Sequence, residues 1–324
     1  MKGVVWVASM SGLFWFQREG EKWERMGQAL DGSNLTCLDV SNAAVVVGGL
    51  EGVMQSLDSG STWQAADEGL AVRHARWVAA HPAVPGLVLV GTEPAAIFRS
   101  DNYGTRWTNC PEIADLRKAG RWFLPYSPES GCIRGLAFHG ERAYAAAEVG
   151  GALRSDDAGR TWRLAEGSEG KAVFEEPPTQ HIHPDVHSIL THPASPDFVY
   201  APTGGGFYLS RDGGKRWELR YECYCRAVWV DPADPDHLIL GPADDVDANG
   251  RIEQSRDAGL TWEAASMGLK VPWRRHMVER FTQFGEGLLA VLSNGEVLFA
   301  DLAALEWRPI LKEIPHVRAI AVSG

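Results

Sequence analysis

The sequence predicts an all-β fold, a seven-bladed β-propeller with four antiparallel strands in each blade. An eight-residue motif recurs along the chain, and a tryptophan recurs with it at intervals of roughly 40 to 55 residues, each long enough for four short strands. These two regularities are typical of propeller blades that repeat around a ring. The recurring tryptophans are Trp23, Trp63, Trp107, Trp162, Trp217, Trp262 and Trp307.

The motif reads Ser-x-Asp-x-Gly-x-Thr-Trp, with small departures, and its five copies begin at Ser56, Ser100, Ser155, Ser210 and Ser255. We expect a strand to end at the serine, the aspartate to accept hydrogen bonds from turn N–H groups, and the glycine to adopt a backbone angle that other residues resist. The tryptophan then opens the return strand and covers the turn. The motif resembles the Asp-box, or BNR repeat, of sialidases, sortilin-type receptors, some xyloglucanases and photosystem assembly factors. That resemblance implies a propeller and a structural role for the motif, because Asp boxes in those families lie away from the active site.

The second repeat shows the strands that we expect within one blade, over residues 35–40, 43–49, 52–57 and 62–66. Before Trp23 there is room for only three strands, whereas after Trp307 one extra strand, 317–323, remains. We expect this strand to become the innermost strand of the first blade, because an open ring would leave unpaired edges. Residues 1–324 then form one propeller domain rather than two domains.

Aligning the seven innermost strands predicts which side chains line the central channel. These strands are expected at 316–323, 34–41, 74–81, 132–139, 185–192, 224–231 and 277–284. Their third residues, which we place at the top mouth of the channel, are Arg318, Thr36, Arg76, Arg134, His187, Arg226 and Glu279. Two residues further along, an apolar layer is expected beneath them, because side chains alternate with a period of two. It consists of Ile320, Leu38, Val78, Leu136, Ile189, Val228 and Phe281.

The arginines at this mouth predict a site for an anionic small molecule or an acidic protein segment, because guanidinium groups bind carboxylate and phosphate in a bidentate manner. The expected ligand-binding residues are Arg76, Arg134, Arg226, Arg318, His74, His187 and Trp122. Trp122 lies in a long connection, 108–131, and a second long connection, 163–184, brings Phe174, Glu175 and Glu176 toward the same mouth. In the alternative interpretation, Glu279, Glu93 and Glu148 neutralise the arginines as structural ion pairs.

The histidines suggest a second function, a lyase or hydrolase acting on an acidic sugar or a similar anion. Six of the ten histidines are expected at the top of the ring, and His183, His187, His74 and His316 are candidate ligands for a divalent transition metal. The candidate catalytic residues are His187, His183, Glu148 and Glu93. The spacing of the histidines along the sequence matches no recognised zinc motif. A true sialidase is disfavoured, since that family has six blades and an N-terminal motif that is missing here. A third interpretation, a scaffold for protein assembly, predicts a large apolar patch on one face.

Composition limits the partners. The net charge of −11 argues against a general nucleic-acid binder, because phosphate would be repelled. Five irregularly spaced cysteines do not form a disulfide framework. No apolar run approaches the roughly 20 residues of a membrane span. Residues 1–9 alternate like a strand and lack the core of a signal peptide, so we expect a cytoplasmic protein.

The arginine cluster is similar to the arginine patch of seven-bladed photosystem assembly factors, although those are exported to a membrane compartment.

Overall fold

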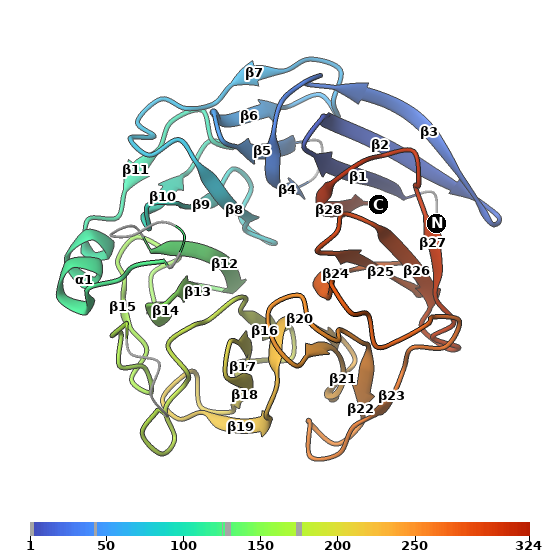
Figure 1. Cartoon of the computed structure of the whole chain (residues 1–324). Helices are drawn as coiled ribbons and strands as arrows, with labels where there is room; N and C mark the ends of the chain where they lie inside the picture. Colours follow the sequence, from blue (N-terminus) through green and yellow to red (C-terminus); the bar gives the residue numbers. More distant parts are fainter. Residues whose placement is uncertain (1–2, 42–43, 125, 127–130, 173–176) are drawn as a thin grey trace.

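The structure, a computed structural model, consists of seven four-stranded antiparallel sheets arranged as blades around a central axis (Figure 1). It describes residues 3–41, 44–124, 126, 131–172 and 177–324. The predicted seven-bladed propeller is therefore confirmed. No helix within the described residues is both long and apolar enough to cross a membrane.

Each blade runs from an inner strand at the channel to an outer strand at the rim, which has two to four residues in blades 2 to 7 and eight in blade 1. Blade 1 contains β28 (Val317–Ser323), β1 (Val4–Ser9), β2 (Gly12–Glu19) and β3 (Lys22–Ala29). Blades 2 and 3 contain β4 (Leu35–Ser41), β5 (Ala44–Gly49), β6 (Gly52–Ser56), β7 (Gln64–Ala65), β8 (Ala75–Ala80), β9 (Val88–Thr92), β10 (Ile97–Ser100) and β11 (Thr108–Asn109). Blades 4 and 5 contain β12 (Cys132–His139), β13 (Arg142–Glu148), β14 (Gly151–Ser155), β15 (Arg163–Leu164), β16 (Leu190–His192), β17 (Ser195–Thr203), β18 (Gly206–Ser210) and β19 (Glu218–Tyr221). Blades 6 and 7 contain β20 (Tyr224–Asp231), β21 (Asp234–Ala243), β22 (Glu253–Ser255), β23 (Glu263–Ala264), β24 (Val278–Phe284), β25 (Gly287–Leu292), β26 (Val297–Asp301) and β27 (Arg308–Ile310).

The ring closes as predicted, because the last strand completes the first blade. Strand β28 pairs antiparallel with β1, with Ile320 opposite Val7 and Ser323 opposite Val4. The two ends of the chain accordingly lie in the same blade (Figure 1). This closure removes the two free sheet edges that an open array would expose.

The repeated turn between the third and fourth strands is held by its own side chains. In blade 6, the Ser255 hydroxyl accepts a hydrogen bond from the Gly259 N–H at 2.8 Å and donates to Asp257 at 2.8 Å. Asp257 also accepts from the Thr261 hydroxyl and N–H, and these bonds lower its pKa to about 2. The indole of Trp262 donates to the Gly259 carbonyl at 3.1 Å. The motif therefore acts as a structural turn at the rim, as the sequence predicts.

The structure differs from the prediction in two local features. The inner strand of blade 5 is short, with regular pairing only over β16, although Val186 forms an isolated bridge to Thr203. The long connection after blade 3 contains a helix, α1 (Glu112–Gly120), that the sequence analysis treated as a loop. The helix ends where Arg121 adopts a left-handed conformation, and its Ile113 is buried against the blade core.

The residues of the predicted apolar layer are largely buried. Six of its seven members are buried, and Phe281 is half-buried against the core of blade 7. Each of the seven packs in a different apolar cluster, so these side chains stabilise the contacts between neighbouring blades. The six buried members are Ile320, Leu38, Val78, Leu136, Ile189 and Val228.

Candidate functional site

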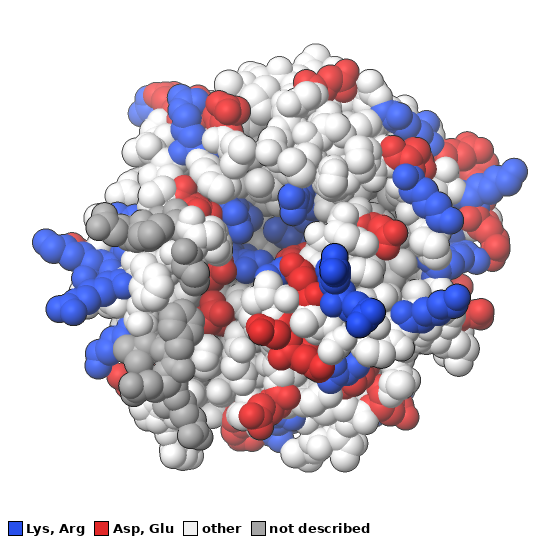
Figure 2. Space-filling model, viewed as in Figure 1, with Lys and Arg blue, Asp and Glu red and all other residues white. Residues whose placement is uncertain are grey.

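A cavity of about 420 Å³ opens at the mouth of the central channel, and the space-filling view shows basic side chains gathered in this hollow (Figure 2). All seven residues that the strand alignment placed at the third position line this one cavity. The alignment therefore identified a ring of side chains that the fold does bring together. The ring consists of Thr36, Arg76, Arg134, His187, Arg226, Glu279 and Arg318.

A β-bulge explains why these residues share one position. In six of the seven inner strands the pairing register shifts around the third residue, as when Arg134 falls between Ile133 opposite Ala147 and Gly135 opposite Ala146. In blade 5, the N–H groups of His187 and Ser188 both donate to the carbonyl of Pro202. A bulge leaves one residue unpaired and redirects its side chain. Each blade thus directs one side chain into the mouth.

The cavity is rich in positive charge. Five arginines line it, against the two carboxylates of Glu148 and Glu279. This sign is opposite to the net charge of the chain, which is −11. The five arginines are Arg76, Arg134, Arg226, Arg280 and Arg318.

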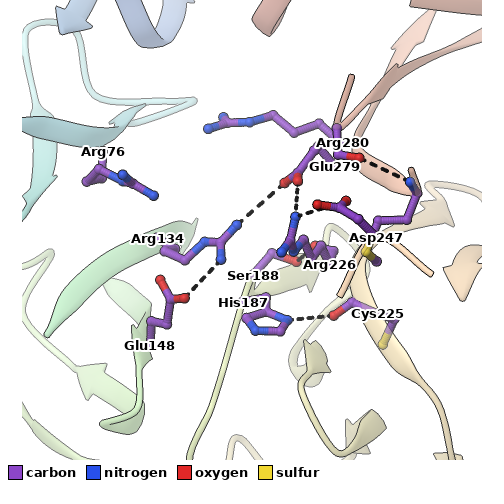
Figure 3. Close-up of polar contacts among 12 residues, drawn as sticks. Arg76, Arg134, Glu148, His187, Ser188, Cys225, Arg226, Asp247, Glu279 and Arg280 are labelled. Carbon is purple, nitrogen blue, oxygen red and sulfur yellow. Dashed lines mark hydrogen bonds and ion pairs between the residues drawn. The ribbon is translucent and has the colours of Figure 1, made fainter. Parts of the chain in front are cut away.

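Two of these arginines belong to a series of ion pairs that crosses the channel, which we call the ion-pair chain (Figure 3). It runs through Glu148, Arg134, Glu279, Arg226 and Asp247. Arg134 lies 3.2 Å from Glu148 and 3.5 Å from Glu279. Arg226 contacts Glu279 directly and lies 3.8 Å from Asp247. The ion-pair chain therefore links blades 4, 6 and 7 across the mouth.

The ionisation of these groups follows from their neighbours. Burial alone would lower the pKa of Arg134, but Glu148 and Glu279 raise that pKa well above its usual value. Burial would likewise raise the pKa of Glu279, yet Arg226 and Arg134 lower it overall. Both groups consequently remain charged near neutral pH.

Arg76 has a separate carboxylate partner. Its guanidinium lies 3.1 Å from Glu93, which directly follows β9. His74 stands 3.9 Å from the same carboxylate, and both burial and the charge of Arg76 lower the pKa of His74. His74 is therefore a neutral hydrogen-bonding group at the mouth near pH 7. The interpretation of the glutamates as structural ion pairs thus describes Arg76, Arg134 and Arg226 correctly.

The fifth arginine, Arg280, was not identified from the sequence. It follows Glu279 on β24, and its guanidinium lies over the ring of Trp77, 4.0 Å from the ring centroid. Simple alternation turns it away from the channel, and only the bulge at Glu279 changes that direction. No short sequence pattern marks such a shift of register. Arg318, at the outer edge of the cavity, is exposed and contacts the sulfur of Met10 at 3.3 Å.

Among the described residues, one group has the composition of a metal site, namely Glu148, Asp185 and His187, whose ligand atoms lie within 4.8 Å of one another. His187 Nδ1 lies 2.8 Å from the Cys225 carbonyl, and its Nε2 lies 3.1 Å from Asp185. The Tyr224 hydroxyl also lies 3.3 Å from Nε2, so both ring nitrogens are already engaged by protein groups. Burial opposes ionisation of Asp185, but His187 outweighs it and lowers the pKa of Asp185 to about 2. The geometry therefore fits a structural ion pair better than a metal centre.

Several predicted site residues lie elsewhere. His183 lines a different groove together with His181, and its Nδ1 accepts a bond from the Asp185 N–H at 3.2 Å. His316 is exposed and does not line the cavity. The four proposed metal-ligating histidines therefore do not converge, because the segment before His187 leads away from the channel. Phe174, Glu175 and Glu176 lie outside the described residues.

Trp122 requires a correction, since it is not at the mouth. Its side chain is 2% exposed and packs with Ile113 of α1 in the core of blade 4. Its indole N–H donates to the Gly170 carbonyl at 2.8 Å. The helix that forms in this connection turns the tryptophan inward. The aromatic residues that do line the cavity are Trp77 and Tyr126.

No family model and no curated protein matches the chain. Solved structures share its fold, and seven-bladed β-propellers are among them. YCF48 from Cyanidioschyzon merolae is 16% identical with a TM-score of 0.63, over 91% of this chain and 89% of that protein. The GH74 xyloglucanase from Xanthomonas campestris is 17% identical with a TM-score of 0.65, over 86% of this chain and 45% of the enzyme. A structure of YCF48 bound to D1 peptide is 14% identical with a TM-score of 0.58, over 90% of this chain and 85% of that one. The chain thus spans less than half the length of the glycosidase, and these similarities establish the fold.

Proposed function

We propose that residues 1–324 form one Asp-box propeller that binds an anionic ligand, either a small acid or an acidic protein segment, at the mouth of its channel. The observation that carries this proposal is the cavity of about 420 Å³, whose lining among the described residues has five arginines and two carboxylates. A carboxylate entering this cavity would leave water for a site whose charges are already oriented, and there charge-assisted hydrogen bonds are strong.

One further observation supports a binding site. A propeller of the same fold has been observed with a bound peptide, under the description YCF48 bound to D1 peptide. That example supports a protein segment as one form that the ligand can take.

The test is titration calorimetry of the whole chain with succinate, inorganic phosphate and a glutamate-rich peptide, at low and at physiological salt. We expect at least one of these anions to bind at a single site, with an affinity that falls as salt rises. Succinamide is the matched neutral probe and should not bind. The control variant is Arg308→Gln, which alters an exposed arginine that pairs with Glu21 away from the mouth. Absence of binding for all three anions, or equal binding of succinamide, would contradict the proposal.

A further inference from the structure

Arg280 differs from the other partly buried arginines of the mouth in its partners. Arg76, Arg134 and Arg226 each have a carboxylate within 4 Å. Within the part of the chain that the structure describes, Arg280 has none, and its one recorded hydrogen bond is from Nη2 to the Thr36 carbonyl at 3.4 Å. Figure 3 shows its side chain extending toward the channel beside Glu279. Arg280 is therefore a cation whose donors are largely unused.

The surroundings of Arg280 are unfavourable to its charge. Burial lowers the pKa of its guanidinium to about 10, and the neighbouring charges of Arg134 and Arg76 act in the same direction. Glu279 raises the pKa of Arg280, but this effect does not offset the lowering by burial. An anion that entered the mouth would supply the negative charge that Arg280 lacks. At the other three partly buried arginines, the anion would have to compete with Glu93, Glu148 or Glu279.

Trp77 fixes the position of the guanidinium. The Arg280 Cζ atom lies 4.0 Å from the centroid of the indole ring, within the range of a favourable cation–π contact. An arginine held over an aromatic face keeps its N–H groups at its edge free, and two of them match the spacing of the oxygens of a carboxylate. Little side-chain entropy is then lost when the ligand binds.

We propose that Arg280, supported by Trp77, is the anchor of the ligand and that it selects a carboxylate over a phosphate dianion. This inference rests on the proposed function and specifies its chemistry. The selection follows from the charges nearby: three of the five arginines are already paired, and the carboxylates of Glu148 and Glu279 line the same cavity. A single planar guanidinium suits one planar monoanionic group, while a doubly charged phosphate would be repelled by these two carboxylates.

The test compares wild-type chain with Arg280→Gln and Arg280→Lys by titration calorimetry with benzoate, a planar monoanion, and with inorganic phosphate at about pH 8, where phosphate is mainly a dianion. We expect wild type to prefer benzoate. Arg280→Gln should bind benzoate about tenfold or more weakly, because a charge-assisted hydrogen bond is lost. Arg280→Lys keeps the charge but not the paired donors, so its preference for benzoate over phosphate should shrink. Arg308→Gln, at the rim, should bind like wild type. Circular dichroism confirms that each variant is folded.

The two proposals fail in different ways. If wild type binds benzoate and both Arg280→Gln and Arg280→Lys bind it equally well, Arg280 is not the anchor, although the mouth still binds anions. A preference of wild type for phosphate would overturn the selection for a carboxylate. If wild type binds no anion, the proposed function itself fails.

Discussion

Glu279 offers the most informative perturbation of the mouth, because its carboxylate lies between two arginines. In Glu279→Gln, Arg134 and Arg226 lose their shared counter-ion and repel each other. The charge of Arg134 already opposes that of Arg226, whose pKa is nevertheless raised overall, with Glu279 as the main cause of the rise. The variant should therefore be less stable than wild type. It should also bind anions more tightly, since the position of the lost carboxylate becomes available to a ligand.

The size of the effect follows from burial. Breaking a buried ion pair costs about 3–5 kcal/mol, because a charge is left without a partner. The side chain of Glu279 is 23% exposed, and Arg134 keeps Glu148 as a partner. We therefore expect a loss of about 2–3 kcal/mol in the free energy of unfolding, somewhat below that range. For a chain of 324 residues this corresponds to a melting temperature lower by about 4 °C.

The assay is urea unfolding with and without 10 mM phosphate, which should restore part of the lost stability in Glu279→Gln. The gain in anion affinity should reach about tenfold, the value of one charge-assisted hydrogen bond to each freed donor group. Arg308→Gln serves as the control. A variant as stable as wild type, or one that gains no affinity for phosphate, would contradict the conclusion that Glu279 is the shared counter-ion of Arg134 and Arg226.

The pH dependence gives an independent check of the same group. The folded-state pKa of Glu279 is lowered from its usual value of 4.5, so its contribution to stability is present above that pH and is lost as pH falls through the folded-state value. The difference in stability between wild type and Glu279→Gln should be full at pH 7 and should narrow below about pH 4. A stability difference between wild type and Glu279→Gln that stays constant down to pH 3 would contradict the role of the ionised Glu279 carboxylate.

Three further predictions concern the turn, the core and the metal alternative. Ser255→Ala leaves the buried N–H of Gly259 without its acceptor and should cost about 1–3 kcal/mol in urea unfolding; no loss would mean that the turn is held otherwise. Trp122→Phe removes the hydrogen bond to Gly170 and should lower stability by about 1–3 kcal/mol while succinate binding is unchanged, whereas weaker binding would return Trp122 to the site. Zn²⁺ should not raise the melting temperature, since both ring nitrogens of His187 already have partners in the protein, and a rise abolished by His187→Gln would instead establish a metal site.

The fold and the ring of mouth residues could be predicted because both depend on strict periodicities. The turn motif recurs once in each of five blades, and the third residue of every inner strand, such as Arg76 or Arg134, occupies an equivalent place. The sequence also predicted two possible partners for the arginines of the ring, namely a bound anionic ligand or a structural carboxylate. It could not decide between them, because that depends on whether Glu93 reaches Arg76 in space.

The remaining features depend on local geometry without a sequence signal. Arg280 enters the cavity because of a bulge at its neighbour, which strict alternation cannot anticipate. Trp122 is buried because the connection that carries it folds into α1 and packs against the blade. His183 and His187 are close in sequence, yet they line different cavities, because the chain leaves the channel between them.

The most direct test of the account is to locate a bound carboxylate. In a crystal of the chain soaked with 4-bromobenzoate, the anomalous signal of bromine should mark one site at the channel mouth, with the carboxylate against the Arg280 guanidinium beside Trp77, and Arg280→Gln crystals should lack it. A bromine site away from the cavity that persists in Arg280→Gln, with no density at the mouth, would contradict the claim that this mouth is an anion-binding site.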